Sequence, residues 1–436
     1  MGVQGTFSDF ASVSTIDRSL SRIRDHKVVL HLAIFFLAFL VLFLRRPDAV
    51  LNAQFYAEDG KYWYAEAYHF GWACLFLPQW GYLQSISRLV AMLSLLVPLA
   101  FAPLVMNLCA LAFQILPVNL FLSSRFAGIP IRMRLLGSVL YLALPNSMEI
   151  HANTTNIQWH LALAACLVLL ARPGVGTLSL VTDASLLALS ILDGPLGMLL
   201  MPVLLALCWQ RKDVRSRRLL VWLLPVTALQ ALVIVFSGSR PPGTLGVTLA
   251  RFNGILGGQL FLSSLLGQRT FAQLYSSHSS LLAVMEAAAI LVGLLVVLYA
   301  LRYGPLELQL FNLFAYAVFA LSLIRPFTMM EGLRQEWDIM QLPGIANRYY
   351  FLPMIAFLSC LFWILREAKP TLRIARYLAT AMVLLLPVGI CRDWRYPPYP
   401  ESNFRETAAQ FERAAPGTRI AIRQNPTDWR MELVKK

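Results

Sequence analysis

The chain has 436 residues, of which 58% are hydrophobic and only 14% are charged, and its mean hydropathy is +0.62. Soluble domains hold roughly 45–50% apolar residues, so this composition excludes an ordinary soluble protein. The net charge of +14 is divided among short clusters between apolar runs, which argues against a nucleic-acid partner. Unbroken apolar runs such as Val28 to Leu44 exclude the alternating strands of a β-barrel. The predicted fold class is an all-α polytopic membrane protein.

The N-terminal segment, residues 1–27, is polar and basic and precedes the first apolar run. No small-residue cleavage site follows that run, because Arg45, Arg46 and Pro47 come next. We therefore expect a retained signal anchor with a cytoplasmic N-terminus. The six cysteines are scattered without metal or redox spacing, which indicates apolar packing.

Basic clusters at residues 18–27, 125–134, 211–218 and 366–376 follow the positive-inside pattern. Counting crossings between them predicts about eleven transmembrane helices, with the C-terminus periplasmic. The expected organisation is a cytoplasmic segment 1–27, a transmembrane domain 28–390 and a periplasmic cap 391–436. Its periplasmic loops are 45–102, 145–157, 237–280 and 325–349.

Two of these predictions concern short segments. Leu83 to Val97 is predicted to be re-entrant or interfacial, because an odd number of crossings is needed and the segment is short, carries Arg88 and ends at Pro98. In the cap, Arg419 to Arg423 and Arg430 to Val434 alternate like two short strands.

An acidic pair, Glu58 and Asp59, stands about ten residues beyond the first apolar run. It could simply favour the dipole of a helix start. The aromatic neighbours Tyr56, Tyr62 and Trp63 instead indicate an interfacial surface, and such surfaces also bind sugars. The pair is therefore the first candidate for catalysis.

Polar residues gather in further outer segments. The loop 145–160 contains His151, Asn153 and Asn156, which could bind a polar ligand or helix ends; its spacing matches no metal site. Asp193 before Gly194-Pro195 is either a turn and helix cap or a functional intramembrane carboxylate. Arg45 and Arg46 either snorkel to the membrane surface or contact a phosphate.

Two late outer loops are basic. Residues 237–280 contain Arg240 and no Asp or Glu, and their Gly and Ser content predicts a partly mobile lid over an anionic ligand, or attraction to lipid headgroups. Residues 325–349 carry mixed charge, and Arg348, followed by Tyr349 at a helix start, is the residue singled out there.

This arrangement resembles the GT-C fold of polyprenyl-phosphate-sugar-dependent glycosyltransferases. The stretches Tyr56-Ala-Glu-Asp-Gly60, Gly81-Tyr-Leu-Gln84 and Asn347-Arg-Tyr-Tyr-Phe-Leu-Pro353 are similar to those of a group of bacterial inner-membrane proteins. The resemblance implies transfer of a sugar, with inversion, from a polyprenyl-phosphate donor to a periplasmic glycan, lipid or protein acceptor. It also implies a location in the bacterial inner membrane.

In that reading Asp59 is the general base and Glu58 orients the acceptor or supports a divalent cation, with the opposite assignment left open. Whether Mg or Mn is required stays undecided. Arg348, Arg240, Arg88 and Arg45/Arg46 are the candidates, in that order, for the donor phosphate. The predicted substrate-binding residues are Tyr56, Tyr62, Trp63, His151, Asn153, Asn156, Asp193 and Tyr349.

Two alternatives remain. A lipid-linked saccharide flippase or transporter would commonly show internal repeats, and none is found in the sequence. An O-antigen-type polymerase or ligase would be expected to depend on Arg and His rather than on an acidic pair.

Overall fold

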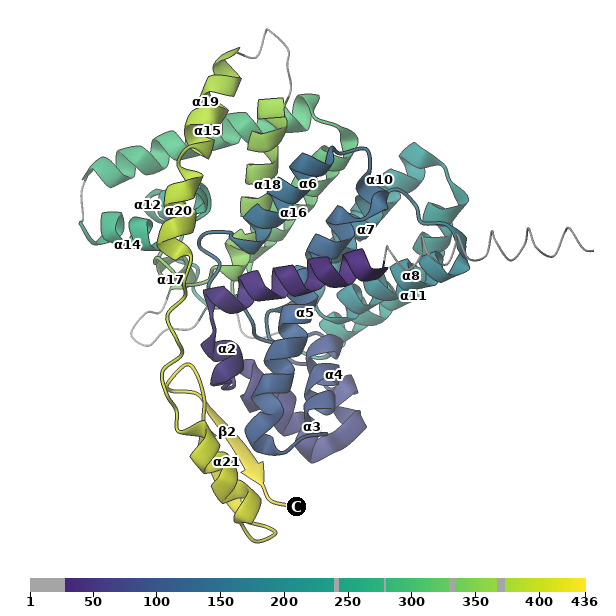
Figure 1. Cartoon of the computed structure of the whole chain (residues 1–436), viewed down its shortest axis with the longest axis vertical. Coiled ribbons are helices and arrows are strands. Elements are labelled where there is room, and N and C mark those ends of the chain that lie inside the picture. Colours follow the sequence, from purple (N-terminus) through teal and green to yellow (C-terminus); the bar gives the residue numbers. More distant parts are fainter. Residues whose placement is uncertain (1–27, 239–242, 278–279, 329–334, 367–372) are drawn as a thin grey trace, which may run out of the picture.

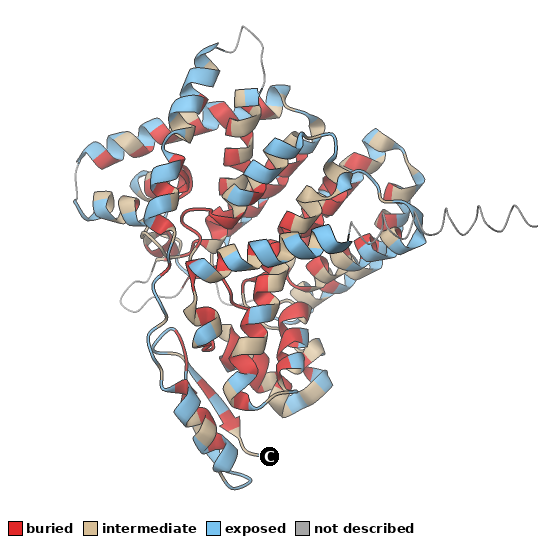
Figure 2. Cartoon of the chain, in the orientation of Figure 1, coloured by how far each residue is buried: buried red, intermediate tan, exposed pale blue. Residues whose placement is uncertain are grey.

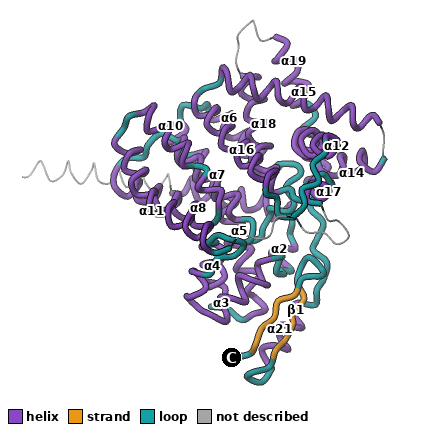
Figure 3. The backbone as a smooth tube through the Cα atoms, turned by 180° about the vertical axis from the view of Figure 1, so that it is seen from behind, coloured by secondary structure: helices purple, strands orange, loops and turns teal. Residues whose placement is uncertain are grey.

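The computed structural model describes residues 28–238, 243–277, 280–328, 335–366 and 373–436 (Figure 1). The predictions made for residues 1–27 and for Arg240 lie outside the described residues. Helices make up most of the described chain, and two strands form near its C-terminus (Figure 3).

Seven helices of the described chain are long and apolar enough to cross a membrane. At about 1.5 Å per residue, 18 or more residues cover most of a hydrocarbon core of about 30 Å. These helices are Val28–Arg45, α5 (Ala102–Leu122, extended by η3, Leu99–Phe101), α11 (Val214–Phe236), α15 (Ser280–Tyr303), α16 (Leu306–Ile324), α18 (Arg348–Arg366) and the pair α19 (Arg373–Val383) with α20 (Leu386–Asp393).

Shorter helices account for the other four predicted crossings. They are α6 (Ile131–Leu142), α7 (Ile157–Leu170), α8 (Gly176–Leu192) and α9 (Pro195–Met198) with α10 (Met201–Arg211). All eleven apolar segments are thus helical, as predicted, although only seven reach full spanning length. The α10–α11 turn is short because Lys212 takes a left-handed conformation and Asp213 caps α11 through the backbone N–H of Ser216, at 2.8 Å.

The connections gather at two opposite ends of the bundle. One, the Glu58 end, joins residues 45–59, 145–156 and 391–425: Tyr396 N donates to Arg45 O at 2.8 Å, and Ala57 pairs with Asn425. The other, the Arg125 end, joins Arg125 to Asp183 at 2.8 Å. The assignment of the Glu58 end to the periplasm and of the Arg125 end to the cytoplasm stays a prediction.

Helix α4 (Ser85–Ser94) begins and ends at the Glu58 end. At its start, Ile86 N donates to Asp193 Oδ1 at 2.8 Å, and after its end Leu99 N donates to Glu412 Oε1 at 3.0 Å. The segment predicted to be re-entrant therefore does not cross the bundle. Its partners explain why a buried helix of ten residues is tolerated: its first backbone donors are satisfied by a carboxylate.

The C-terminal cap lies beside the small helices that follow the acidic pair (Figure 1). It consists of α21 (Phe404–Arg413) and an antiparallel hairpin of β1 (Arg419–Arg423) and β2 (Arg430–Val434), which confirms the two predicted strands. The neighbouring elements are α2 (Asp48–Leu51), the π-helix η1 (Asp59–Tyr64), α3 (Ala65–Phe70) and the 3₁₀ helix η2 (Gly71–Phe76). Phe404, Phe411 and Leu433 of the cap join Phe55 and Trp63 in one buried cluster.

The lid predicted for residues 237–280 is wrong for the described part of that loop. It folds into α12 (Leu249–Asn253), the π-helix η5 (Gly254–Leu262), α13 (Ser263–Leu266) and α14 (Gln268–Ser276), and η5 is buried throughout. The glycines serve close packing: a Cβ at Gly257 would lie 2.4 Å from the backbone oxygen of Glu286 on α15. The apolar residues between these glycines are buried in the core, where a lid over a ligand site would not lie.

Burial divides the bundle as a membrane protein requires (Figure 2). Buried residues concentrate where α7, α16 and α18 meet, while α11, α15 and α19 expose large apolar side chains such as Leu224, Leu295 and Leu378. Exposed leucines and valines on long helices indicate a surface that faces lipid rather than water.

Candidate functional site

The acidic pair lies where the first outer loop meets the cap. Asn425 N donates to Phe55 O at 3.1 Å, and the Tyr56 ring stacks on Tyr399 at 5.3 Å. Ala57 then takes a positive φ of 48° and Asp59 begins the π-helix η1. Wide helical turns of this kind occur frequently at functional sites. The cap therefore fixes the backbone that presents both carboxylates.

Asp59 is buried and fully hydrogen-bonded. It accepts from Thr154 N at 3.0 Å, from Thr155 N at 2.7 Å and from Thr155 Oγ1 at 2.8 Å. Burial raises the pKa of the Asp59 carboxyl to about 7, although the bonds from Thr155 and Thr154 lower it. Both oxygens are in use, so Asp59 anchors the loop 145–156 to η1.

Glu58 is the more accessible residue of the pair, because it is only partly buried whereas Asp59 is buried. Burial raises the pKa of its carboxyl above the usual 4.5, while Arg348, a hydrogen bond from Thr155 and Lys61 lower it. Burial and, after it, the charge of Glu58 raise the pKa of Tyr62. Glu58 therefore lies close enough to Arg348 and Tyr62 to interact with both electrostatically.

Arg348, the first residue of α18, is paired with Glu149. Its guanidinium forms an ion pair with Glu149, its backbone N donates to Glu149 Oε2 at 3.2 Å, and a second nitrogen donates to Phe327 O. The guanidinium also lies 4.7 Å from the Tyr349 ring. The Arg348 side chain keeps 21% of its surface exposed, so it can be reached by a ligand.

An aromatic wall borders this centre. The ring centroids of Tyr62 and Trp80 lie 5.9 Å apart, and those of Trp80 and Phe327 lie 4.9 Å apart. The backbone oxygen of Phe327 accepts hydrogen bonds from Arg348 and Tyr349. Trp80 and Gly81 both have positive φ, at 57° and 91°, in the tight turn between Gln79 and Tyr82. A tryptophan in that conformation is uncommon, which indicates a position fixed by its surroundings.

Several predicted site residues have structural partners instead. Arg88 is fully buried, pairs with Glu66 and lies 5.1 Å from the ring of Trp63, which is itself fully buried. Neither a phosphate nor a sugar could reach this pair without entering the core. Asp193 accepts from Ile86 N and Ser87 N, at 2.8 and 3.4 Å, and so caps α4 rather than facing a cavity.

Arg45 and Arg46 neither snorkel nor lie free for a phosphate. Arg45 donates to Leu142 O at 2.8 Å and Leu144 O at 3.0 Å, and it lies 4.4 Å from the Tyr396 ring. Arg46 lies 4.2 Å from the Tyr399 ring. Both are buried, so they bind the C-terminal segment to the end of the first helix.

The polar loop 145–160 holds itself in shape. Asn153 and Asn156 both donate to the backbone oxygen of Glu149, at 2.7 and 3.1 Å, which holds the Glu149 backbone in place. His151 is buried near Gln114, and burial together with Arg46 and Arg45 lowers its pKa well below 6.5, so it is neutral. The bonds of Asn153 and Asn156 thus lie within the loop itself, and binding of a polar ligand by these residues stays a prediction.

A metal centre does not fit these residues. In the described part of the chain, no three His, Cys, Asp or Glu side chains come together as a metal-binding group. Both oxygens of Asp59 accept hydrogen bonds from Thr154 and Thr155, and Glu58 faces Arg348, whose positive charge would repel a cation.

Of the predicted set, the structure thus places Tyr349 against Arg348 and adds Glu149, Trp80 and Phe327, with Tyr62 packed on Trp80. The predicted residues Glu58 and Tyr56 lie near enough to Arg348 to interact with it electrostatically, as does Tyr82. The sequence analysis did not single out Glu149. The signal available was that it is the one carboxylate of residues 145–160. Its partner, Arg348, follows 199 residues later.

Two solved structures of oligosaccharyltransferase from Archaeoglobus fulgidus are similar to this chain. One is AglB in complex with an inhibitory peptide and a dolichol-phosphate, at 12% identity and a TM-score of 0.37. The other is tethered to an acceptor peptide containing the NVT sequon, at 13% identity and a TM-score of 0.38. The matches cover 88% of this chain and 58% and 57% of those chains, so it spans little more than half their length. No protein-family model and no curated protein matches. The likeness concerns the arrangement of helices alone.

Proposed function

We propose that the protein is a membrane glycosyltransferase that moves a sugar, with inversion, from a polyprenyl-phosphate donor to an acceptor at the Glu58 end of the bundle. The observation that carries the proposal is the Arg348–Glu149 ion pair beside an aromatic wall, with the partly buried Glu58 close enough to Arg348 to interact with it electrostatically. It supplies the three things that such a transfer needs: a base, a cation for the leaving phosphate and a surface that binds sugar.

Glu58 is the general base in this proposal. The sequence analysis preferred Asp59 for that role and left Glu58 open as the alternative. It is partly exposed, whereas every acceptor oxygen of Asp59 is bonded to the loop. A base whose pKa is raised by burial holds a proton more readily at neutral pH than an ordinary glutamate. Glu58 would take the proton of the acceptor hydroxyl as the bond to the sugar forms. Asp59 acts as a positioning residue.

Arg348 stabilises the polyprenyl phosphate as it leaves. When the bond between the anomeric carbon and the phosphate oxygen breaks, its electron pair stays on that oxygen, which gains negative charge. A guanidinium can donate two hydrogen bonds to the resulting phosphate. The same guanidinium is paired with Glu149 in the structure, so the phosphate must displace that carboxylate. Donor binding is thereby coupled to movement of the Glu149 side chain.

The aromatic wall suits the sugar. Rings of Tyr62, Trp80 and Phe327 lie in contact with one another and border the Arg348 contact. Aromatic faces bind the apolar faces of sugar rings, and the phenolic oxygen of Tyr62 offers a polar edge. Acceptors of three classes, glycan, lipid and protein, are compatible with this surface.

The test is transfer by the purified protein in liposomes, using a radiolabelled polyprenyl-phosphate sugar and a mixture of acceptors. Wild type should release polyprenyl phosphate and label an acceptor, and Glu58→Gln should reduce the rate by about 10²–10⁴-fold. Glu432→Gln removes an exposed carboxylate on β2 and should have no effect.

Two other results have defined meanings. Equal rates for Glu58→Gln and wild type would remove Glu58 from the chemistry. Movement of intact donor across the liposome membrane without acceptor labelling would replace the transferase by the flippase alternative.

A further inference from the structure

A cavity of about 730 Å³ lies inside the bundle, apart from the Glu58 centre. It is bounded by α5 and α6 on one side and by α7, α16 and α18 on the other. Most of its lining is apolar, with Val118, Leu136, Leu163, Phe311 and Leu358 among the lining residues. Its size falls within the roughly 300–1,000 Å³ of ordinary ligand sites.

The cavity exists because α6 packs on α5 and small residues face the gap. Gly137 and Ser138 of α6 and Ser359 of α18 line it. A Cβ at Gly137 would approach the Phe121 ring to 3.1 Å, so a larger residue there would disturb α5. Apolar space of this kind attracts hydrocarbon, and in a membrane the surrounding hydrocarbon is lipid.

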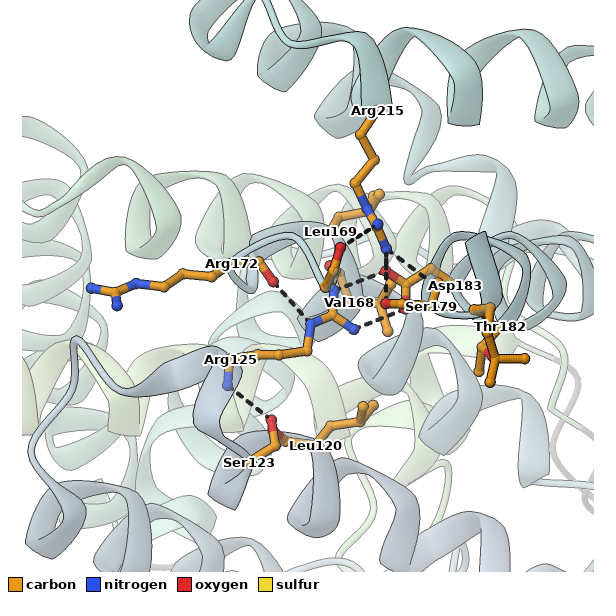
Figure 4. A network of polar contacts seen from close by, with 12 residues as sticks. Leu120, Ser123, Arg125, Val168, Leu169, Arg172, Ser179, Thr182, Asp183 and Arg215 are labelled. Carbon is orange, nitrogen blue, oxygen red and sulfur yellow. Dashed lines mark hydrogen bonds and ion pairs between the residues drawn. The ribbon is translucent and has the colours of Figure 1, made fainter. Parts of the chain in front are cut away.

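The mouth of the cavity at the Arg125 end is basic. Arg125, Arg172 and Arg366 line it, against a single carboxylate, Glu307. Arg125 is committed to Asp183, whereas the Arg172 side chain extends away from that cluster (Figure 4). The Arg172 guanidinium lies 3.3 Å from the position that a Cβ of Gly128 would occupy. The mouth thus has positive charge available for an anion.

We propose that this cavity binds one anionic glycerophospholipid, with an acyl chain between α6 and α18 and the phosphate beside Arg172 and Arg366. Charge complementarity selects the anionic headgroup, and the apolar lining selects the chain. The proposal does not depend on the transferase reaction.

The geometry separates this site from donor binding. Arg348 and Arg366 begin and end α18, and 18 residues at about 1.5 Å each place them about 27 Å apart. A phosphate beside Arg366 is therefore at the opposite end of the helix from the Glu58 centre. A polyprenyl-phosphate donor bound here could not present its sugar to Glu58.

The experiment is native mass spectrometry of the delipidated protein in mild detergent, titrated with phosphatidylglycerol or with phosphatidylcholine of the same chains. Wild type should bind one phosphatidylglycerol in preference to phosphatidylcholine. Replacing both Arg172 and Arg366 by Gln should weaken phosphatidylglycerol binding about 30-fold, at about five-fold per arginine, and remove the headgroup preference. The matched control Arg423→Gln, on exposed β1, should bind as wild type does.

Filling the cavity tests the chain. Ser359→Phe should abolish binding of both lipids, and Leu308→Trp provides a second filled variant if the first does not fold. Unchanged binding in a folded filled variant would overturn the proposal, as would displacement of the bound phosphatidylglycerol by one equivalent of polyprenyl phosphate. Transfer activity, measured separately, reports on the Glu58 centre alone.

Discussion

The two ends of the bundle each hold an arginine–carboxylate cluster, and the clusters are completed differently. At the Arg125 end, Asp183 accepts from both nitrogens of Arg125, at 2.8 and 2.9 Å, and from Arg215 at 2.5 Å (Figure 4). The remaining donors reach backbone oxygens, such as Val168 O at 3.2 Å and Gly174 O at 2.6 Å. That cluster links the ends of α5, α7, α8 and α11.

At the Glu58 end one arginine, Arg348, pairs with one carboxylate, Glu149, and also lowers the pKa of Glu58 through its charge; both Arg348 and Glu58 remain partly exposed. The cluster at the Arg125 end joins side chains and backbone oxygens of four helices and so holds them together, whereas Arg348 and Glu58 adjoin the aromatic wall, where a protein partner can be exchanged for a ligand. The comparison predicts that mutations at one end reduce stability and mutations at the other reduce activity.

The largest expected effect is on folding. Asp183→Asn leaves Arg125 and Arg215 without their anion, and breaking a buried pair costs about 3–5 kcal/mol of unfolding free energy. Thermal unfolding in detergent should show a clearly lower melting temperature for Asp183→Asn, while the protein that remains folded keeps the wild-type transfer rate. A wild-type melting temperature for Asp183→Asn would contradict a structural role for this cluster.

The next effect is on catalysis. Arg348→Ala should lower the transfer rate by about 10²–10³-fold, because it removes donors aimed at the developing charge of the phosphate. Arg348→Lys should also be impaired, since lysine keeps the charge and loses the two-pronged geometry. Rates equal to wild type in Arg348→Lys would reduce the residue to a general attraction for lipid headgroups.

A smaller and opposite effect is expected at Glu149. Glu149→Gln removes the anion that competes with phosphate for Arg348, so the affinity for polyprenyl phosphate should rise about ten-fold. Isothermal titration in detergent measures it, with Glu432→Gln as the exposed control. Weaker binding by Glu149→Gln would mean that Glu149 orients Arg348 instead of competing for it.

The smallest effect is on the pH profile. As a base, Glu58 works only when ionised, so activity falls as pH decreases through its pKa, which burial raises above 4.5. The positive charge of Arg348 lowers that pKa, so in Arg348→Gln the acidic limb should move to higher pH. The rate is measured from pH 4 to 9 in both proteins. An acidic limb at the same pH in wild type and Arg348→Gln would show that Arg348 does not influence the pKa of Glu58.

Much of the fold could be predicted from local pattern. Apolar runs identified eleven helical segments, alternation identified β1 and β2, and the spacing of basic residues required that the segment containing α4 should not cross. Each of these features depends on residues that are neighbours in sequence, so burial against lipid or the core constrains them regardless of distant partners.

The partners of the charged residues were decided by tertiary structure alone. Arg45 donates to the backbone oxygens of Asp393 and Trp394, almost at the other end of the chain. Asp193 caps helix α4, whose residue Ile86 lies 107 positions earlier. From sequence, an arginine at a helix end looks the same whether it meets a carbonyl, a ring or a phosphate. Only packing showed that Glu58 stays open while Asp59, the next residue, is fully bonded, because adjacent residues on a helical turn point in different directions.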